Sequence, residues 1–157
     1  MQVLIQNKQK EKVGLKAVSG LARRVLKDLG CRDNAELSIL LTDNNDIQEL
    51  NKRYLKKDKP TDVLSFPMRD FNSKPLTPDS EFILGDIVIS IETAKAQAKE
   101  NDVTLDEEMA RLLIHGILHL LGFDHEKSGK EALRMEKEEE RLLEIANCKL
   151  QNANWRL

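Results

Sequence analysis

The segment from Thr104 to Gly122 constrains the fold more than any other part of the chain, because it carries both a start and a stop signal for a helix. Thr104-Leu-Asp-Glu107 is an S/T-x-x-E capping box, the pattern that begins many helices. The residues that follow are mainly apolar, and Gly122 can adopt the left-handed backbone that ends a helix. The sequence therefore predicts an apolar core helix over about residues 105–121.

All three histidines of the chain lie in or just beyond this helix. His115 and His119 are four residues apart, which places them about 40° apart around the helix and about 6 Å apart along it. Both side chains then lean in the same direction. A turn at Gly122 would bring His125 back toward them from a different direction. We expect the three imidazoles to converge on one metal ion.

Three imidazoles with one open coordination position are typical of a catalytic zinc site, because structural zinc sites are generally closed by four protein ligands. Zinc in such a site can generate hydroxide from water near neutral pH. The alternative is that His115 and His119 are packed histidines on an apolar helix face. The complete spacing favours one Zn²⁺ ion bound by His115, His119 and His125.

The same spacing occurs in the metzincin signature H-E-x-x-H-x-x-G-x-x-H, with one difference. Gly116 stands where those proteases have the glutamate that acts as general base, and the loss of a general base typically costs about 10² to 10⁴ in rate. Met135 lies within a predicted helix, where a core position explains it better than a methionine turn. A metallopeptidase of metzincin-like geometry therefore remains only an alternative.

The remaining hydrophobic patterns predict an α+β fold, with a single domain over residues 1–157. We expect a small mixed sheet of four strands together with about five helices, one of which is the core helix that carries the metal site. We expect a surface loop at residues 69–82 and a solvated charged face at 136–141. The expected strands cover residues 3–5, 35–41, 61–68 and 84–90, and the other helices cover 15–29, a segment between 44 and 60, 92–99 and 130–145.

The charge balance limits where a nucleic acid could bind. The chain has 25 basic and 27 acidic residues, so its net charge of −2 does not attract polyanions as a whole. A local cluster is nevertheless basic, and we expect Arg53, Lys56 and Lys57 within it to contact backbone phosphates of a bound nucleic acid. A solvated helix end is the alternative explanation. The cluster comprises Lys52, Arg53, Lys56, Lys57 and Lys59.

Sequence signals for export and for cysteine chemistry are weak. The apolar run at residues 3–5 is too short for a signal peptide, so we expect a cytoplasmic protein. Cys31 and Cys148 have no metal-ligand spacing and are interpreted as ordinary thiols.

Three motifs resemble those of the YbeY family of bacterial metal-dependent endoribonucleases. Residues 115–125, HGILHLLGFDH, match the family's histidine motif HGxLHLxGxDH. Residues 58–67, DKPTDVLSFP, resemble its second motif, and residues 84–87, LGDI, resemble its third. One departure is that Leu55 follows Tyr54, where the family commonly has an arginine implicated in activity.

The resemblance implies a zinc-dependent endoribonuclease specific for single strands, acting in small-subunit ribosomal RNA 3′-end maturation and in ribosome quality control. It also implies an α+β fold in which a metalloprotease-like core helix carries the metal site. Its partners would be ribosomal RNA and the ribosome or small-subunit proteins, with no membrane and no DNA. A non-catalytic ribosome-assembly factor with a structural metal is a further alternative. Asp124 and Glu126 could orient a ligand or carry a proton, and Asp86 could either pack or hydrogen-bond to a ligand histidine.

Overall fold

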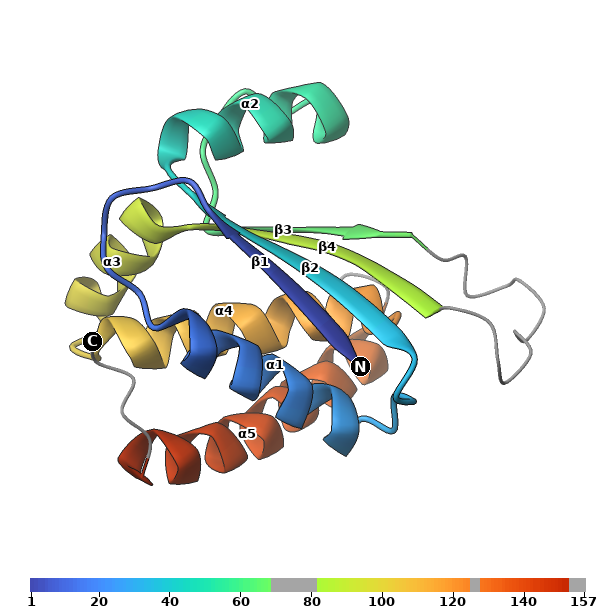
Figure 1. The fold of residues 1–157 in the computed structure, drawn as a ribbon. Helices are drawn as coiled ribbons and strands as arrows, with labels where there is room; N and C mark the ends of the chain where they lie inside the picture. Colours follow the sequence, from blue (N-terminus) through green and yellow to red (C-terminus); the bar gives the residue numbers. More distant parts are fainter. Residues whose placement is uncertain (69–81, 125–127, 153–157) are drawn as a thin grey trace.

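A mixed four-stranded sheet carries helices on both faces in the computed structural model (Figure 1), which describes residues 1–68, 82–124 and 128–152. The α+β class and the order of strands and helices match the prediction. The bounds are β1 (Gln2–Asn7), α1 (Leu15–Asp28), β2 (Ala35–Thr42), α2 (Asn44–Leu55), β3 (Val63–Pro67), β4 (Phe82–Ser90), α3 (Ile91–Glu100), α4 (Leu105–Leu120) and α5 (Gly129–Asn152).

The sheet has the strand order β1-β2-β4-β3. The pairs β1·β2 and β2·β4 are parallel, whereas β3 pairs with β4 in the antiparallel direction. As a result β3 is an edge strand, with one side open beyond the sheet. The functional groove described below lies along this edge.

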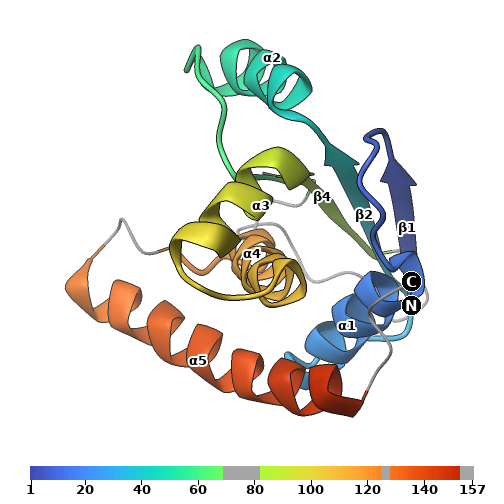
Figure 2. The ribbon, with the colours of Figure 1, turned by 90° about the vertical axis from the view of Figure 1, so that its left-hand side faces the viewer.

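The predicted core helix is α4, and it lies between the sheet and α5 (Figure 2). Its capping box is formed, because the Glu107 N–H donates to Thr104 Oγ1 at 3.1 Å and the Thr104 N–H donates to Glu107 Oε2 at 3.4 Å. The aliphatic residues of α4 are buried against β3, β4, α1 and α5. This packing holds α4 at a fixed position over the sheet, which in turn fixes the histidines that it carries.

The contact between β3 and β4 depends on Gly85. Its φ of +141° is in a region that residues with side chains rarely adopt. A Cβ atom at this position would collide with the backbone carbonyl oxygen of Phe66 on β3. The register between β2 and β4 also shifts here, next to Leu37. Glycine is therefore required where the second and third sequence motifs meet.

Some predicted boundaries differ from those observed. Strand β3 is shorter than predicted, since Thr61, Asp62 and Met68 lie outside it; the Asp62 side chain accepts from the Val63 N–H at the bend that precedes the strand. Helix α5 is longer than predicted and continues to Asn152. The predicted loop at 69–82 lies outside the described residues, except that β4 already begins at Phe82. No helix in the described ranges is both long and apolar enough to cross a bilayer.

Candidate active site

His115 and His119 bring their ring nitrogens together on the partly exposed side of α4. The two Nε2 atoms are 3.0 Å apart, and the rings meet edge to face with centroids 4.6 Å apart. The spacing of four residues on a helix accounts for this arrangement, as predicted from the sequence. The two Nε2 atoms are therefore close neighbours on the same side of the helix.

This pair of nitrogens fits a zinc ion. Two nitrogens bound to zinc at about 2.0–2.1 Å with tetrahedral angles are about 3.3 Å apart, close to the separation observed. His115 Nδ1 lies 2.6 Å from Glu139 Oε1 on α5. Because a neutral imidazole carries one N–H, a proton on Nδ1 facing this carboxylate leaves the Nε2 lone pair available for a metal.

The chain turns sharply after His119, as the glycine predicted. Gly122 has a φ of +93°; its N–H donates to the His119 carbonyl, and the Phe123 N–H donates to the Leu118 carbonyl. These two bonds form a Schellman motif, which ends α4. The third predicted ligand, His125, lies outside the described residues, as does Glu126. Within residues 1–68, 82–124 and 128–152, no group of three His, Cys, Asp or Glu could hold a metal ion.

Glu139 is a site residue that the sequence analysis missed. The prediction of a solvated face at 136–141 is wrong at this position, although Glu136, Lys137 and Glu140 are exposed. Helix α5 buries Met135, Leu142 and Ala146 against the core, and position 139 continues the same stripe at helical spacing. A carboxylate within an otherwise apolar stripe is the sequence signal that could have identified it.

Gly116 packs α4 directly onto the sheet. A Cβ atom there would lie 3.1 Å and 3.2 Å from two carbons of Ile87 and 3.2 Å from Ser65 Oγ. Position 116 therefore faces the sheet, whereas the two histidines meet elsewhere on the helix surface. A side chain at this position would point into packed atoms of β3 and β4.

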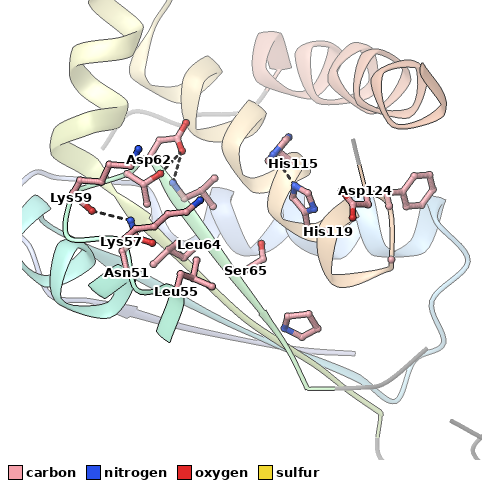
Figure 3. A pocket seen from close by; sticks show the side chains of 15 residues that line it. Asn51, Leu55, Lys57, Lys59, Asp62, Leu64, Ser65, His115, His119 and Asp124 are labelled. Atoms are coloured by element: carbon pink, nitrogen blue, oxygen red, sulfur yellow. Dashed lines mark hydrogen bonds between the residues drawn. The ribbon is translucent and has the colours of Figure 1, made fainter. Parts of the chain in front are cut away.

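A groove of about 610 Å³ opens beside the histidines (Figure 3). Lys57 and Lys59 enter it from the segment between α2 and β3, and His115, His119 and Asp124 line it from the side of α4. The groove thus combines cationic and imidazole groups on opposite sides. Its other lining residues are Asn51, Leu55, Thr61, Asp62, Val63, Leu64, Ser65, Pro67, Gly122 and Phe123.

Of the residues predicted to bind substrate, the structure places Lys57 in this groove. Arg53 and Lys56 are exposed and do not line it, so their contact with RNA stays a prediction. Lys56 ends α2 in the left-handed conformation, with a φ of +57°. Lys59, which the sequence placed in the basic cluster only, is a groove residue.

Contacts with α2 hold the lysine-bearing segment in place. Asn51 is only 2% exposed, and its Nδ2 donates to the Lys59 carbonyl at 2.9 Å. The Lys57 N–H donates to the Asn51 carbonyl at 3.2 Å. Gln48 Nε2 donates to Asp58 Oδ1 at 3.0 Å. The backbone of this segment is therefore fixed, and the two lysines rise from a rigid base.

Arg111, one helical turn before His115, belongs to a charged network next to the groove. It forms hydrogen bonds to both carboxylate oxygens of Glu108, which is 2% exposed, and lies 3.9 Å from Asp62 Oδ2. The hydrogen bond to Glu108 raises the pKa of Arg111, and the charges of Asp62 and Glu139 act in the same direction against the effect of burial. Arg111 is thus a permanent positive charge near His115.

Two other positions singled out in the sequence are Asp86 and Leu55. Asp86 lies within β4, and it is exposed. Since successive side chains alternate across a strand and Ile87 faces α4, Asp86 is on the opposite face. Of the two suggested roles of Asp86, a hydrogen bond to His115 or His119 is therefore excluded, and His125 lies outside the described residues. Leu55, at the position of the family arginine, lines the groove and supplies no charge.

Comparisons with known proteins agree with the motifs. The family model for endoribonuclease YbeY matches residues 4–147. A protein named endoribonuclease YbeY from Aquifex aeolicus is 51% identical over 82% of this chain and 81% of its own length. Another of that name from Syntrophotalea carbinolica is 44% identical, covering 88% of this chain and 91% of its own.

A solution structure of a Thermotoga maritima protein has the same fold. It superposes with a TM-score of 0.66 at 25% sequence identity, covering 96% of this chain and 92% of the other. The match of nearly the whole chain to the family model, together with relatives above 40% identity, shows the family. This chain belongs to the endoribonuclease YbeY family.

Proposed function

We propose that this protein is a zinc-dependent endoribonuclease that cuts single-stranded RNA. The observation that carries the proposal is the meeting of His115 Nε2 and His119 Nε2 at 3.0 Å beside a groove that also holds Lys57 and Lys59. Phosphodiester cleavage needs a site that positions the phosphate and stabilises negative charge on it. The two sides of this groove offer those two capabilities.

The residues proposed to hold the metal are His115, His119 and His125. In such a site, zinc supplies stabilisation of charge on phosphoryl oxygens and activation of water. Lys57 and Lys59 would bind backbone phosphates and place the strand across the groove. Asp124 also lines the groove, where a carboxylate can orient a ligand or accept a proton.

The packing at position 116 argues against the metallopeptidase alternative. Because this position faces Ile87 and Ser65, the place of the metzincin glutamate is filled by helix-to-sheet contact. The groove instead presents lysines, which suit a polyanionic substrate better than a neutral peptide.

We further propose that the RNA is small-subunit ribosomal RNA, cut during 3′-end maturation and ribosome quality control in the cytoplasm. Membership of the YbeY family supports this assignment. The partners would be the ribosome or its small-subunit proteins.

The test uses the purified full-length protein with single-stranded and double-stranded RNA of one sequence. We expect cleavage of the single strand only, loss of cleavage after chelation, and recovery with zinc. His119→Ala should lose cleavage with an unchanged melting temperature. Cleavage at the original rate by protein shown to be metal-free would contradict zinc dependence. Unfolding of His119→Ala without any RNA cleavage by the wild type would favour an assembly factor with a structural metal, and cleavage of casein but not RNA would favour a peptidase.

A further inference from the structure

The carboxylate of Glu139 meets the ring of His115 across two helices. Glu139 Oε1 and His115 Nδ1 are 2.6 Å apart and are separated by 24 residues in the chain. Both side chains are about three-quarters buried, with relative exposures of 25% and 26%. A short contact between partly buried groups restricts the ring more than a contact at the free surface.

We infer that Glu139 is the positioning residue of the histidine centre: it holds His115 in the tautomer that carries its proton on Nδ1 and directs Nε2 toward His119. This inference rests on the proposed function in one respect, since it assumes that the two Nε2 atoms serve a metal. Carboxylates that bond to the outer nitrogen of a ligand histidine fix the ring and increase its basicity.

The placement of Glu139 within α5 supports this role. Met135, Leu142 and Ala146 on the same stripe are each at most 1% exposed, so an apolar residue would fit position 139. A carboxylate costs free energy in such surroundings unless it is hydrogen-bonded. The hydrogen-bond partner of Glu139 is His115. Arg111 also lies near, and the negative charge of Glu139 contributes to raising the pKa of Arg111.

A second contact joins α5 to the same site. The Arg134 guanidinium carbon lies 4.6 Å from the ring centroid of Phe123, in the turn that follows α4. The long C-terminal helix therefore contacts both the first histidine and the segment leading toward His125. Helix α5 thus contacts the site at two places, and one of them is the His115 ring itself.

The test compares three variants at position 139. Glu139→Ala removes the acceptor, Glu139→Leu removes it while filling the apolar stripe, and Glu139→Gln keeps a weaker, neutral acceptor. Glu140→Ala is the matched control, because Glu140 is the adjacent residue, carries the same charge and is exposed. Zinc affinity is measured on the metal-free full-length proteins by competition with a chromophoric chelator.

We expect zinc affinity to fall by about 10- to 100-fold in Glu139→Ala and Glu139→Leu, which is the usual effect of losing such a partner. Glu139→Gln should lie between these variants and the wild type, and Glu140→Ala should match the wild type. Melting temperatures of the metal-free proteins show whether folding is retained. If Glu139→Ala unfolds, Glu139→Leu provides the result, because leucine suits the stripe.

A second readout does not depend on a metal. Long-range ¹H–¹⁵N spectra of metal-free protein at about pH 8, above the ordinary pKa of a free imidazole, identify the tautomer of each histidine. We expect the Nδ1–H form of His115 in the wild type and a shift toward the Nε2–H form in Glu139→Leu.

The two readouts separate the inference from the proposed function. Unchanged zinc affinity and an unchanged His115 tautomer in a folded Glu139→Leu protein would overturn the inference. If the wild type bound no zinc, the zinc proposal would fail, and the tautomer measurement would still decide the role of Glu139.

Discussion

The Ser65 hydroxyl donates a hydrogen bond to the carbonyl oxygen of Gly116 at 3.1 Å, joining edge strand β3 to helix α4. Gly116 directly follows His115, so this bond lies one residue from the proposed metal centre. Because position 116 has no side chain, the helix can approach Ile87 and Ser65 closely. The height of the histidines above the sheet depends on this contact.

Restoring the metzincin glutamate at position 116 should therefore destabilise the protein without creating a peptidase. The new carboxylate would place a charge among packed atoms of β3 and β4, and we expect Gly116→Glu to lower the free energy of unfolding by more than about 2 kcal/mol. In Gly116→Ala, crowding is offset by a helix-propensity gain of about 1 kcal/mol, so its change should be smaller. Urea unfolding measures both variants, and a stable Gly116→Glu protein that cleaves casein would contradict this expectation.

We expect the ion pair of Glu108 and Arg111 to stabilise the fold, because Glu108 is buried and needs hydrogen-bond partners. Glu108 is 2% exposed and depends on Arg111 and Gln97 for its hydrogen bonds. We expect Arg111→Met to cost about 1–3 kcal/mol, less than for a fully buried pair because Arg111 is partly solvated. Combining it with Glu108→Gln should recover part of this loss. A double-mutant cycle from urea unfolding measures the coupling, and strictly additive losses would show that the two residues act independently.

The lysines of the groove should contribute to RNA affinity through charge. We expect Lys57→Ala and Lys59→Ala each to weaken binding of single-stranded RNA and to reduce the slope of log affinity against log salt by about 0.7. Binding is measured by fluorescence anisotropy over a series of salt concentrations. Lys16→Ala is the control, since Lys16 is exposed on α1 and does not line the groove.

The same measurement tests the wider basic cluster. Arg53→Ala and Lys56→Ala should lower the slope if RNA extends beyond the groove over the end of α2. A slope unchanged in both Lys57→Ala and Lys59→Ala would show that neither lysine contacts phosphate.

Cys31 should react slowly with alkylating reagents, in agreement with its interpretation as an ordinary thiol. Burial raises the pKa of the Cys31 thiol, so the reactive thiolate is scarcer than in a free thiol at the same pH. Iodoacetamide labelling of a Cys148→Ser protein, followed by mass spectrometry, should be slower than labelling of glutathione at about pH 8. Labelling as fast as that of glutathione would contradict the effect of burial.

The raised pKa of Cys31 also determines how the free energy of unfolding changes with pH. The thiol of the unfolded chain loses its proton at a lower pH than the folded thiol, because burial raises the folded value. The contribution of Cys31 to stability is therefore fully present below the ordinary thiol pKa and declines as the pH rises above it. Comparing Cys31→Ser with the wild type by urea unfolding from about pH 7 to pH 10 measures the change.

Local rules predicted much of the architecture. The capping box at Thr104, the glycine turn at Gly122 and the alternation of apolar residues depend on contacts within a few residues, so the sequence shows them directly. The spacing of His115 and His119 belongs to the same class, and their nitrogens meet as expected. Strand boundaries were less accurate: β3 begins at Val63, two residues after the predicted start, because the preceding Thr61 and Asp62 are polar and lie outside the apolar run.

What the sequence by itself determined is the helix, its two ends and the pair of histidines on one face, since helical geometry alone relates those residues. Tertiary structure alone decided that Glu139 reaches His115, that position 116 faces the sheet, and that Asp86 lies on the opposite face of the sheet from α4. The physical reason is that these relationships depend on how helices pack on a sheet across long separations in the chain. A periodic pattern defines which face of an element is apolar, but the side chain that it meets depends on the packing of the whole molecule.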